Sequence, residues 1–151
     1  MKFLIIRFSS IGDIVLTTPV VRCLRKKYPD AQIHFLTKQV FRSILDHNPN
    51  IDKVHTLRDS FELMLHELQV EEYDYIVDLH HNLRTLRIKR HLKKVRSFSF
   101  NKLNIEKFVL TNFKINILPK KHIVDRNLET VASLGIINDG MGLDYFIPKM
   151  D

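Results

Sequence analysis

Short runs of consecutive apolar residues, each followed by a stretch with helical spacing, constrain the fold of this chain most. The runs lie at residues 3–6, 33–36, 54–57, 75–79 and 95–98. They are continuous rather than alternating, which is typical of parallel strands covered on both faces by helices. The pattern predicts an α/β fold with a doubly wound, Rossmann-like parallel sheet.

Apolar residues at helical spacing between the runs predict the connecting helices. They are expected over residues 14–28, 40–47, 60–70, 82–93, 104–111 and 125–134, the last closed by Gly135. Residues 138–142 have the composition of a turn, and residues 145–148 form a short extended run. We therefore expect one domain over residues 1–138 and the start of an interdomain linker over residues 139–151.

Composition excludes several classes of protein. The chain has 151 residues, one cysteine (Cys23) and a formal charge of +7. A single cysteine on the apolar side of a predicted helix provides no disulfide framework, which favours a cytoplasmic protein with a buried thiol. No apolar stretch approaches the roughly 20 residues that span a bilayer, so any contact with the inner membrane is expected to be peripheral. The positive charge predicts attraction to polyanions without identifying which.

The loop after the first apolar run carries the most specific chemistry. It contains Ser9, Ser10, Gly12 and Asp13 directly before the first predicted helix. It lacks both the three-glycine dinucleotide fingerprint and the Lys-Ser/Thr pair of a P-loop. Ligands of doubly wound sheets bind beyond the carboxyl ends of the strands, so Asp13 is placed to meet one. Ser10 and Asp13 also fit a capping box, and both interpretations stay open on spacing alone.

Three segments resemble one enzyme family. Residues 5–19 (IIRFSSIGDIVLTTP), residues 73–79 (YDYIVDL) and residues 122–127 (HIVDRN), the last followed by Leu-Gly-Ile at 134–136, are similar in order and spacing to the ADP-heptose:lipopolysaccharide heptosyltransferases of glycosyltransferase family 9. That family has two facing Rossmann-like domains, the GT-B fold. The resemblance implies that this chain is the amino-terminal, acceptor-side domain and lacks the carboxyl-terminal nucleotide-sugar domain.

The resemblance also implies a reaction. It is the inverting, metal-independent transfer of heptose from ADP-heptose to a hydroxyl of the lipopolysaccharide inner core. Asp13 matches the carboxylate proposed as general base in the family, and Ser9, Ser10 and Gly12 would shape the substrate-binding loop. No cofactor is implied, because ADP-heptose is a substrate bound mainly by the other domain. We expect these 151 residues alone to be inactive.

Basic residues near the predicted strand ends suit an anionic acceptor. Arg58 follows the third apolar run, Arg84 opens a basic stretch over residues 84–96, and Arg126 precedes the last helical pattern. The arginine fork can bond two oxygens of a carboxylate or phosphate at once. His80 is a further candidate substrate contact. We expect no metal site at His80 and His81, because adjacent side chains of an extended segment point to opposite sides.

Three alternatives remain at this level. A related glycosyltransferase with another nucleotide-sugar donor would have the same acceptor half. A basic module that binds nucleic acid would explain the charge, although no nucleic-acid-binding signature occurs and nucleic acid is not the expected partner. A self-contained Rossmann enzyme that binds a nucleotide would share the fold. The exact donor, the exact acceptor and the oligomeric state do not follow from the sequence.

Overall fold

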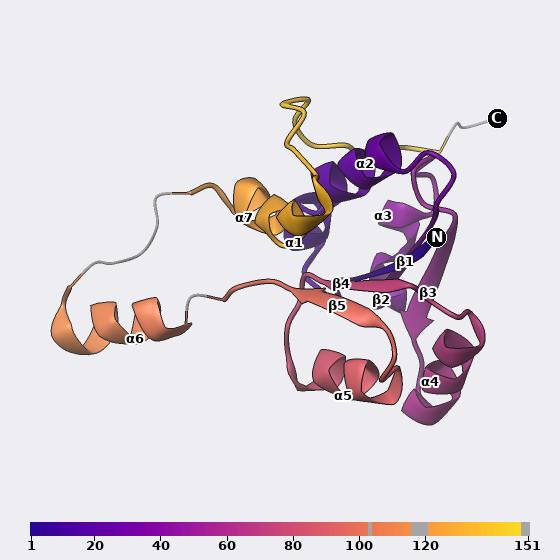
Figure 1. Cartoon of the computed structure of the whole chain (residues 1–151), viewed down its shortest axis with the longest axis horizontal. Helices are drawn as coiled ribbons and strands as arrows, with labels where there is room; N and C mark the ends of the chain where they lie inside the picture. The colour runs from indigo at the N-terminus through magenta and orange to yellow at the C-terminus, as the bar shows by residue number, and fades with distance from the viewer. Residues whose placement is uncertain (103, 116–120, 149–151) are drawn as a thin grey trace.

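A fully parallel sheet of five strands forms the centre of the protein. The computed structural model describes residues 1–102, 104–115 and 121–148, and the strand order in their sheet is β3-β2-β1-β4-β5 (Figure 1). The strands are β1 (Lys2–Ile6), β2 (Gln32–Lys38), β3 (Lys53–Leu57), β4 (Tyr75–Asp78) and β5 (Arg96–Ser99). Each coincides with one apolar run, with ends shifted by at most 2 residues. The predicted α/β class and doubly wound sheet are confirmed.

Helices follow the strands in the predicted order. They are α1 (Ile11–Val15), α2 (Thr18–Lys27), α3 (Arg42–Leu45), α4 (Phe61–Val70), α5 (Leu83–His91), α6 (Asn104–Phe113) and α7 (Ile123–Glu129), with 3-10 helices η1 (Gln39–Phe41) and η2 (Ala132–Leu134). The Ser60 hydroxyl and the Asn82 side-chain carbonyl cap α4 and α5 by accepting hydrogen bonds from backbone amides. Gly135 ends η2 with a φ of 74°, a left-handed conformation that favours glycine. No helix within the described ranges is long and apolar enough to cross a bilayer.

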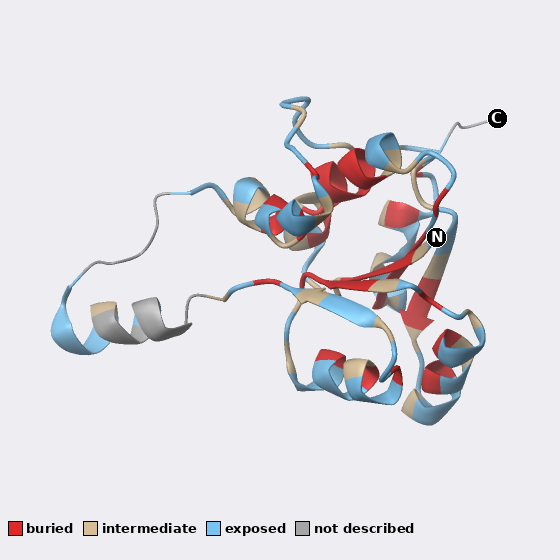
Figure 2. Ribbon diagram, viewed as in Figure 1, coloured by how far each residue is buried: buried red, intermediate tan, exposed pale blue. Residues whose placement is uncertain are grey.

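Two apolar clusters cover the two faces of the sheet. On one face, α2, α3 and α7 contribute residues such as Val21, Leu45 and Leu128. On the other, α4 and α5 contribute Met64, Leu65, Leu68 and Ile88. The central strands are accordingly buried on both sides (Figure 2). Each fully buried aliphatic side chain contributes roughly 1.5 to 3 kcal/mol, so these clusters supply most of the stabilising free energy. Cys23 belongs to the first cluster and is buried, as expected, and its burial raises the pKa of the thiol.

The sequence predicts one helix over residues 14–28 for the first crossover, and the structure differs from this prediction. The crossover is broken into α1 and α2, with Pro19 in the first turn of α2. Proline has no N–H with which to bond the Val15 carbonyl, as an unbroken helix would require. The Thr18 hydroxyl donates to that carbonyl instead, at 2.7 Å. The break leaves α1 as a separate short turn that carries Asp13.

The edge strand β5 also departs from the prediction that helices cover both faces of every strand. Arg96, Ser97 and Ser99 are exposed, and only Phe98 is partly buried. The reason is topological: among the described residues, β5 lies at the end of the strand order and pairs only with β4. Its polar side chains therefore face water, as is usual for an edge strand.

The segment after η2 returns to α2. Arg22 Nε donates to Asp139 Oδ2 at 2.8 Å, and Arg22 Nη2 donates to Asp139 Oδ1 at 2.7 Å. The third nitrogen, Nη1, donates to the Asp144 carboxylate at 2.6 Å. The Arg22 fork therefore fastens this part of the segment predicted as linker onto the domain. The domain boundary at residue 138 stays a prediction, and residues 149–151 of the predicted linker lie outside the described residues.

Candidate functional site

The candidate site lies where the strand order reverses. β1 pairs with β2 on one side and with β4 on the other, so the crossovers to β2 and β5 run in opposite directions. The loop after β1 and the loop after β4 are therefore neighbours, and the Leu79 N–H donates to the Ile6 carbonyl at 3.0 Å. A crevice at this position is the usual ligand site of a doubly wound sheet.

Asp13 is held at the start of α1 by its own loop. Its Oδ2 accepts hydrogen bonds from the Ser10 N–H at 3.1 Å and from the Ser10 hydroxyl at 2.8 Å, so the predicted capping box is present. Nη2 of Arg7 lies 3.1 Å from the same oxygen, and the Asp13 side chain remains 41% exposed. Desolvation acts to raise the pKa of Asp13, but the Ser10 hydrogen bonds and the Arg7 charge outweigh it and lower the pKa. Asp13 is thus an ionised carboxylate open to a ligand.

Arg7 connects the two loops, a role that the sequence analysis missed. Its Nε donates to the Ser9 carbonyl at 2.7 Å, and its Nη1 donates to the Leu79 carbonyl at 2.8 Å. Together with the contact to Asp13, these bonds use all three guanidinium nitrogens of Arg7. The only signal in the sequence is the position of Arg7 directly after the first apolar run.

His80 lies beside Arg7 on the loop after β4. Its ring packs against Phe8 with 4.9 Å between centroids, and its Nδ1 is buried without a hydrogen-bond partner among the described residues. Burial first, and then the charge of Arg7, lowers the pKa of His80 to about 4, so the imidazole is neutral at physiological pH. His80 therefore offers the crevice a polar ring that carries no charge.

The buried Asp78 fixes the loop that carries His80. Its Oδ1 accepts hydrogen bonds from the backbone N–H groups of His80 at 3.1 Å and His81 at 2.7 Å, and the Lys89 ammonium lies 2.9 Å from its Oδ2. His81 points elsewhere, with Nδ1 2.7 Å from the Phe100 carbonyl oxygen. The two histidines thus have separate surroundings.

A pocket of about 310 Å³ opens over these residues. Its lining comprises Arg7, Asp13, His80, Phe100, Lys102, Lys107, Ile123, Arg126 and Asn127. Four cationic side chains therefore surround one carboxylate and one neutral imidazole. Such a balance favours a ligand that carries negative charge and presents a hydroxyl to Asp13.

Arg126 reaches this pocket from α7. Its Nη2 donates to the Asn101 carbonyl at 2.8 Å, and its guanidinium carbon lies 4.9 Å from the centre of the Phe100 ring. The buried Asn127 beside it donates to the Leu16 carbonyl at 3.1 Å, which fastens α7 to the end of α1. Three residues between β5 and α7 also line the pocket: Phe100, Lys102 and Lys107.

The residues predicted from sequence divide into three groups. Asp13, His80 and Arg126 line the pocket together. Ser9, Ser10 and Gly12 form the adjoining loop, and a Cβ added to Gly12 would meet no atom within 4 Å, so glycine leaves open space there. Arg58 and Arg84 are outside the pocket lining: Arg58 lies 3.4 Å from Glu67, and Arg84 is exposed on the first turn of α5. Lys102 and Lys107 line the pocket without having been predicted.

Curated relatives of the chain share one description. It is 28% identical over 158 residues to lipopolysaccharide heptosyltransferase 1 of Campylobacter coli, a match covering 99% of this chain and 44% of that protein. It is also 28% identical over 139 residues to lipopolysaccharide heptosyltransferase 3 of Escherichia coli K12, a match covering 83% of this chain and 40% of that protein. This chain resembles the lipopolysaccharide heptosyltransferases. The resemblance drawn from its motifs is thereby confirmed, although no family profile matches. The chain spans less than half the length of these relatives.

Solved structures of heptosyltransferases share the fold. A glycosyltransferase family 9 structure from Veillonella parvula superposes with a TM-score of 0.75 at 21% identity, covering 98% of this chain and 46% of that one. Escherichia coli heptosyltransferase WaaC with ADP superposes with a TM-score of 0.70 at 19% identity, covering 95% of this chain and 50% of that one. The fold is therefore shared with about half of each of these glycosyltransferase chains.

Proposed function

We propose that this chain is the acceptor-binding half of a heptosyltransferase that transfers heptose from ADP-heptose to the lipopolysaccharide inner core. The observation that carries the proposal is Asp13, an ionised and open carboxylate at the switch point of the sheet, inside a pocket rich in cations. The names of the curated relatives support the sugar, and structures of WaaC with ADP and with ADP-2-deoxy-2-fluoro heptose support the donor.

Asp13 would act as the general base. Its Oδ takes the proton of the acceptor hydroxyl while the hydroxyl oxygen attacks the anomeric carbon of the heptose. The bond between that carbon and the ADP phosphate oxygen breaks, ADP leaves with the electron pair, and attack from the opposite side inverts the configuration. The Ser10 and Arg7 contacts keep Asp13 ionised before the reaction. No metal or cofactor takes part in this scheme, and the donor is bound mainly by a second domain.

The cations of the pocket would bind the acceptor. Lipopolysaccharide acceptors carry carboxylate and phosphate groups at a membrane surface, and Arg7, Lys102, Lys107 and Arg126 converge beside Asp13. Arg58 and Arg84 lie farther out and would meet only more distant parts of such a molecule. This arrangement fits a cytoplasmic enzyme that contacts the inner membrane peripherally.

A binding experiment tests the acceptor half directly. Deacylated, heptose-free core oligosaccharide is titrated into the ¹⁵N-labelled chain. We expect amide shifts concentrated in residues 7–13 and at His80, and at least about tenfold weaker binding by Arg126→Met, which loses charge-assisted hydrogen bonds. Arg90→Met, on the exposed side of α5, is the matched control. Shifts confined to other surfaces would contradict the assignment of the pocket.

A transfer assay tests the reaction. It uses a two-domain protein in which this chain precedes a donor-binding half of the relatives' kind, with ADP-heptose and core-deficient lipopolysaccharide as substrates. Asp13→Asn should lower kcat by at least about a hundredfold, because an amide cannot accept the proton. Asp59→Asn, an exposed acid outside the pocket lining, should keep full activity. Activity with another nucleotide sugar but none with ADP-heptose would show that the proposed donor is wrong, while the proposed role of Asp13 as general base would stand.

A further inference from the structure

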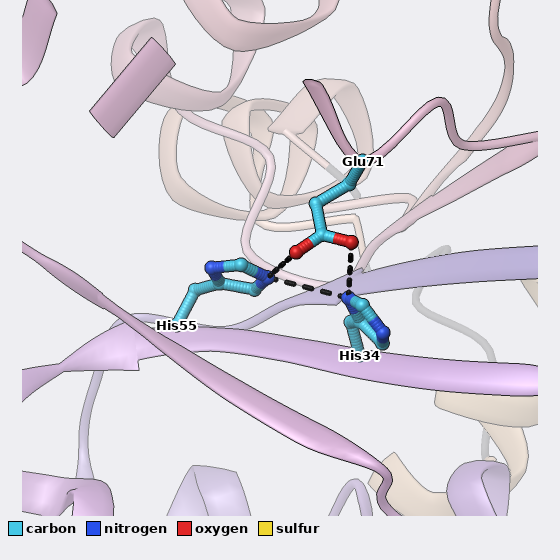
Figure 3. Close-up of side chains that lie close together, drawn as sticks. All are labelled: His34, His55 and Glu71. Atoms are coloured by element: carbon cyan, nitrogen blue, oxygen red, sulfur yellow. Dashed lines mark hydrogen bonds and ion pairs between the residues drawn. The ribbon is translucent and has the colours of Figure 1, made fainter. Parts of the chain in front are cut away.

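Three potential metal ligands meet near the amino ends of the strands, away from Asp13. His34 comes from β2, His55 from β3, and Glu71 from the connection between α4 and β4 (Figure 3). His55 is paired with Leu36, two residues after His34, so both imidazoles project from the same face. Figure 3 shows the three side chains pointing toward one another. Because Glu71 precedes β4, the cluster lies toward the amino ends of the strands, away from the proposed active site.

The distances within this cluster are short. His34 Nδ1 lies 3.2 Å from His55 Nε2. The Glu71 carboxylate oxygens lie 3.9 Å from His34 Nδ1 and 3.8 Å from His55 Nε2. The histidine side chains are 4% and 6% exposed, and that of Glu71 is 16% exposed. Three coordinating groups are thus gathered in a shielded place that the transferase mechanism does not use.

We propose that His34, His55 and Glu71 bind one divalent transition-metal ion of the Zn²⁺ class. A tetrahedral zinc ion with bonds of about 2.0 to 2.1 Å holds its ligand atoms roughly 3.4 Å apart. The two ring nitrogens are already close to that spacing. One Glu71 oxygen lies within 4.8 Å of both nitrogens, so the carboxylate needs to approach by roughly 1 Å. Two imidazoles and a carboxylate form a known zinc ligand set, which leaves a fourth position for water.

The surroundings provide orientation and access. Burial lowers the pKa of both imidazoles, that of His55 to about 4, so both rings are uncharged at neutral pH and each can present one nitrogen lone pair. The Lys2 ammonium, 3.2 Å from Glu71 Oε2, and the Lys53 ammonium on Oε1 orient the carboxylate from outside. A pocket of about 480 Å³ lined by His55, Lys53 and Glu71, among others, connects the cluster with solvent.

Three neighbouring groups also compete with the ion. The Tyr73 hydroxyl lies 2.8 Å from His34 Nδ1 and 3.0 Å from His55 Nε2, where it can donate to only one of them. The positive charges of Lys2 and Lys53 repel a divalent cation, and both ammonium groups already contact the Glu71 oxygens that the ion would bind. Lys53 is 53% exposed and can move aside at little cost. The ion would then join β2, β3 and the α4–β4 connection, which strengthens the edge of the sheet.

Calorimetric titration of the metal-free chain with Zn²⁺ tests this proposal. We expect one equivalent to bind with a micromolar or lower Kd and to raise the Tm, an effect that EDTA reverses. His34→Gln, His55→Gln and Glu71→Gln should each weaken binding at least about tenfold. His47→Gln, an exposed histidine outside the cluster, is the matched control. Lys53→Gln should tighten binding, because a competing cation is removed.

A second measurement remains valid if a buried variant fails to fold. In the unaltered chain, Zn²⁺ should shift the ¹⁵N resonances of His34 Nδ1 and His55 Nε2 specifically, since these atoms face each other. Co²⁺ should give the visible absorption of a tetrahedral site. No saturable binding, or binding that only His47→Gln reduces, would overturn the proposal. Because transferase activity is not part of either readout, failure here leaves the proposed function untouched.

Discussion

Asp13 and Glu71 are both carboxylates that contact cations, and they lie toward opposite ends of the strands of the same sheet: Asp13 follows β1, and Glu71 precedes β4. Asp13 contacts one arginine and one serine and keeps 41% of its side chain exposed. Glu71 contacts two lysines and two histidines and is 16% exposed, and the lysine hydrogen bonds outweigh desolvation and lower its pKa to about 2. A carboxylate can react only if a substrate can reach it. The difference in exposure therefore supports the proposed catalytic role of Asp13 and favours a structural role for Glu71.

Removing Arg7 should have the largest effect after removal of Asp13 itself. Arg7→Met in the two-domain protein is expected to lower kcat by about tenfold or more, because Asp13 and the Leu79 loop lose their common partner. The loss of a neighbouring positive charge raises the pKa of Asp13, so the acidic limb of the pH–rate profile should move to higher pH. Arg90→Met should move neither quantity. A lower kcat with an unmoved acidic limb would contradict electrostatic coupling between Arg7 and Asp13.

Removing the charge of Glu71 should instead affect stability. Glu71→Gln in chelator-treated protein is expected to lower the free energy of unfolding by about 1 to 3 kcal/mol, because Lys2 and Lys53 lose an ionised partner in a largely buried place. Urea unfolding measures this. Glu67→Gln is the control, since its 3.4 Å pair with Arg58 is exposed and should contribute under about 1 kcal/mol. Equal losses of unfolding free energy for Glu71→Gln and Glu67→Gln would mean that the largely buried Glu71 contacts stabilise the fold no more than an exposed ion pair.

Acid should lower the free energy of unfolding through two histidines, His80 at the candidate site and His55 near Glu71. Burial lowers the pKa of His80 and of His55 to about 4 from an ordinary 6.5. A depressed histidine pKa means that the stability is fully present above about pH 6.5 and is lost as the pH falls toward 4. The free energy of unfolding should therefore fall between about pH 6.5 and 4. His80→Gln and His55→Gln should each flatten that dependence, and a dependence unchanged in both variants would refute the burial effect.

Much of the fold follows from the sequence, since the five strands need only apolar runs that fill both faces of a parallel sheet. The break before α2 was missed because it depends on Thr18 replacing the hydrogen bond that Pro19 cannot make. The exposure of β5 depends on strand order, which no local pattern encodes.

The candidate site was predictable only where one loop contains it. Asp13 and Ser10 are three residues apart, so spacing alone indicated their contact. Arg7 meets Leu79 only because β1 pairs with β4, and Lys102 joins the pocket only through the path of the chain after β5. His34 and His55 were missed because each interrupts an apolar strand, and only the strand register places them together.

The smallest expected effect comes from Ser10. Ser10→Ala removes the hydroxyl that donates to Asp13 at 2.8 Å but keeps the backbone N–H that donates at 3.1 Å. We expect a loss of about 0.5 to 1 kcal/mol in the free energy of unfolding and a smaller drop in kcat than for Arg7→Met, because one of the contacts that hold Asp13 disappears. Ser10→Thr should restore both. Ser43→Ala, an exposed serine on α3 outside the pocket lining, is the matched control. A drop in kcat for Ser10→Ala that exceeds the drop for Arg7→Met would mean that the serine hydroxyl, and not the arginine, chiefly positions Asp13 for the reaction.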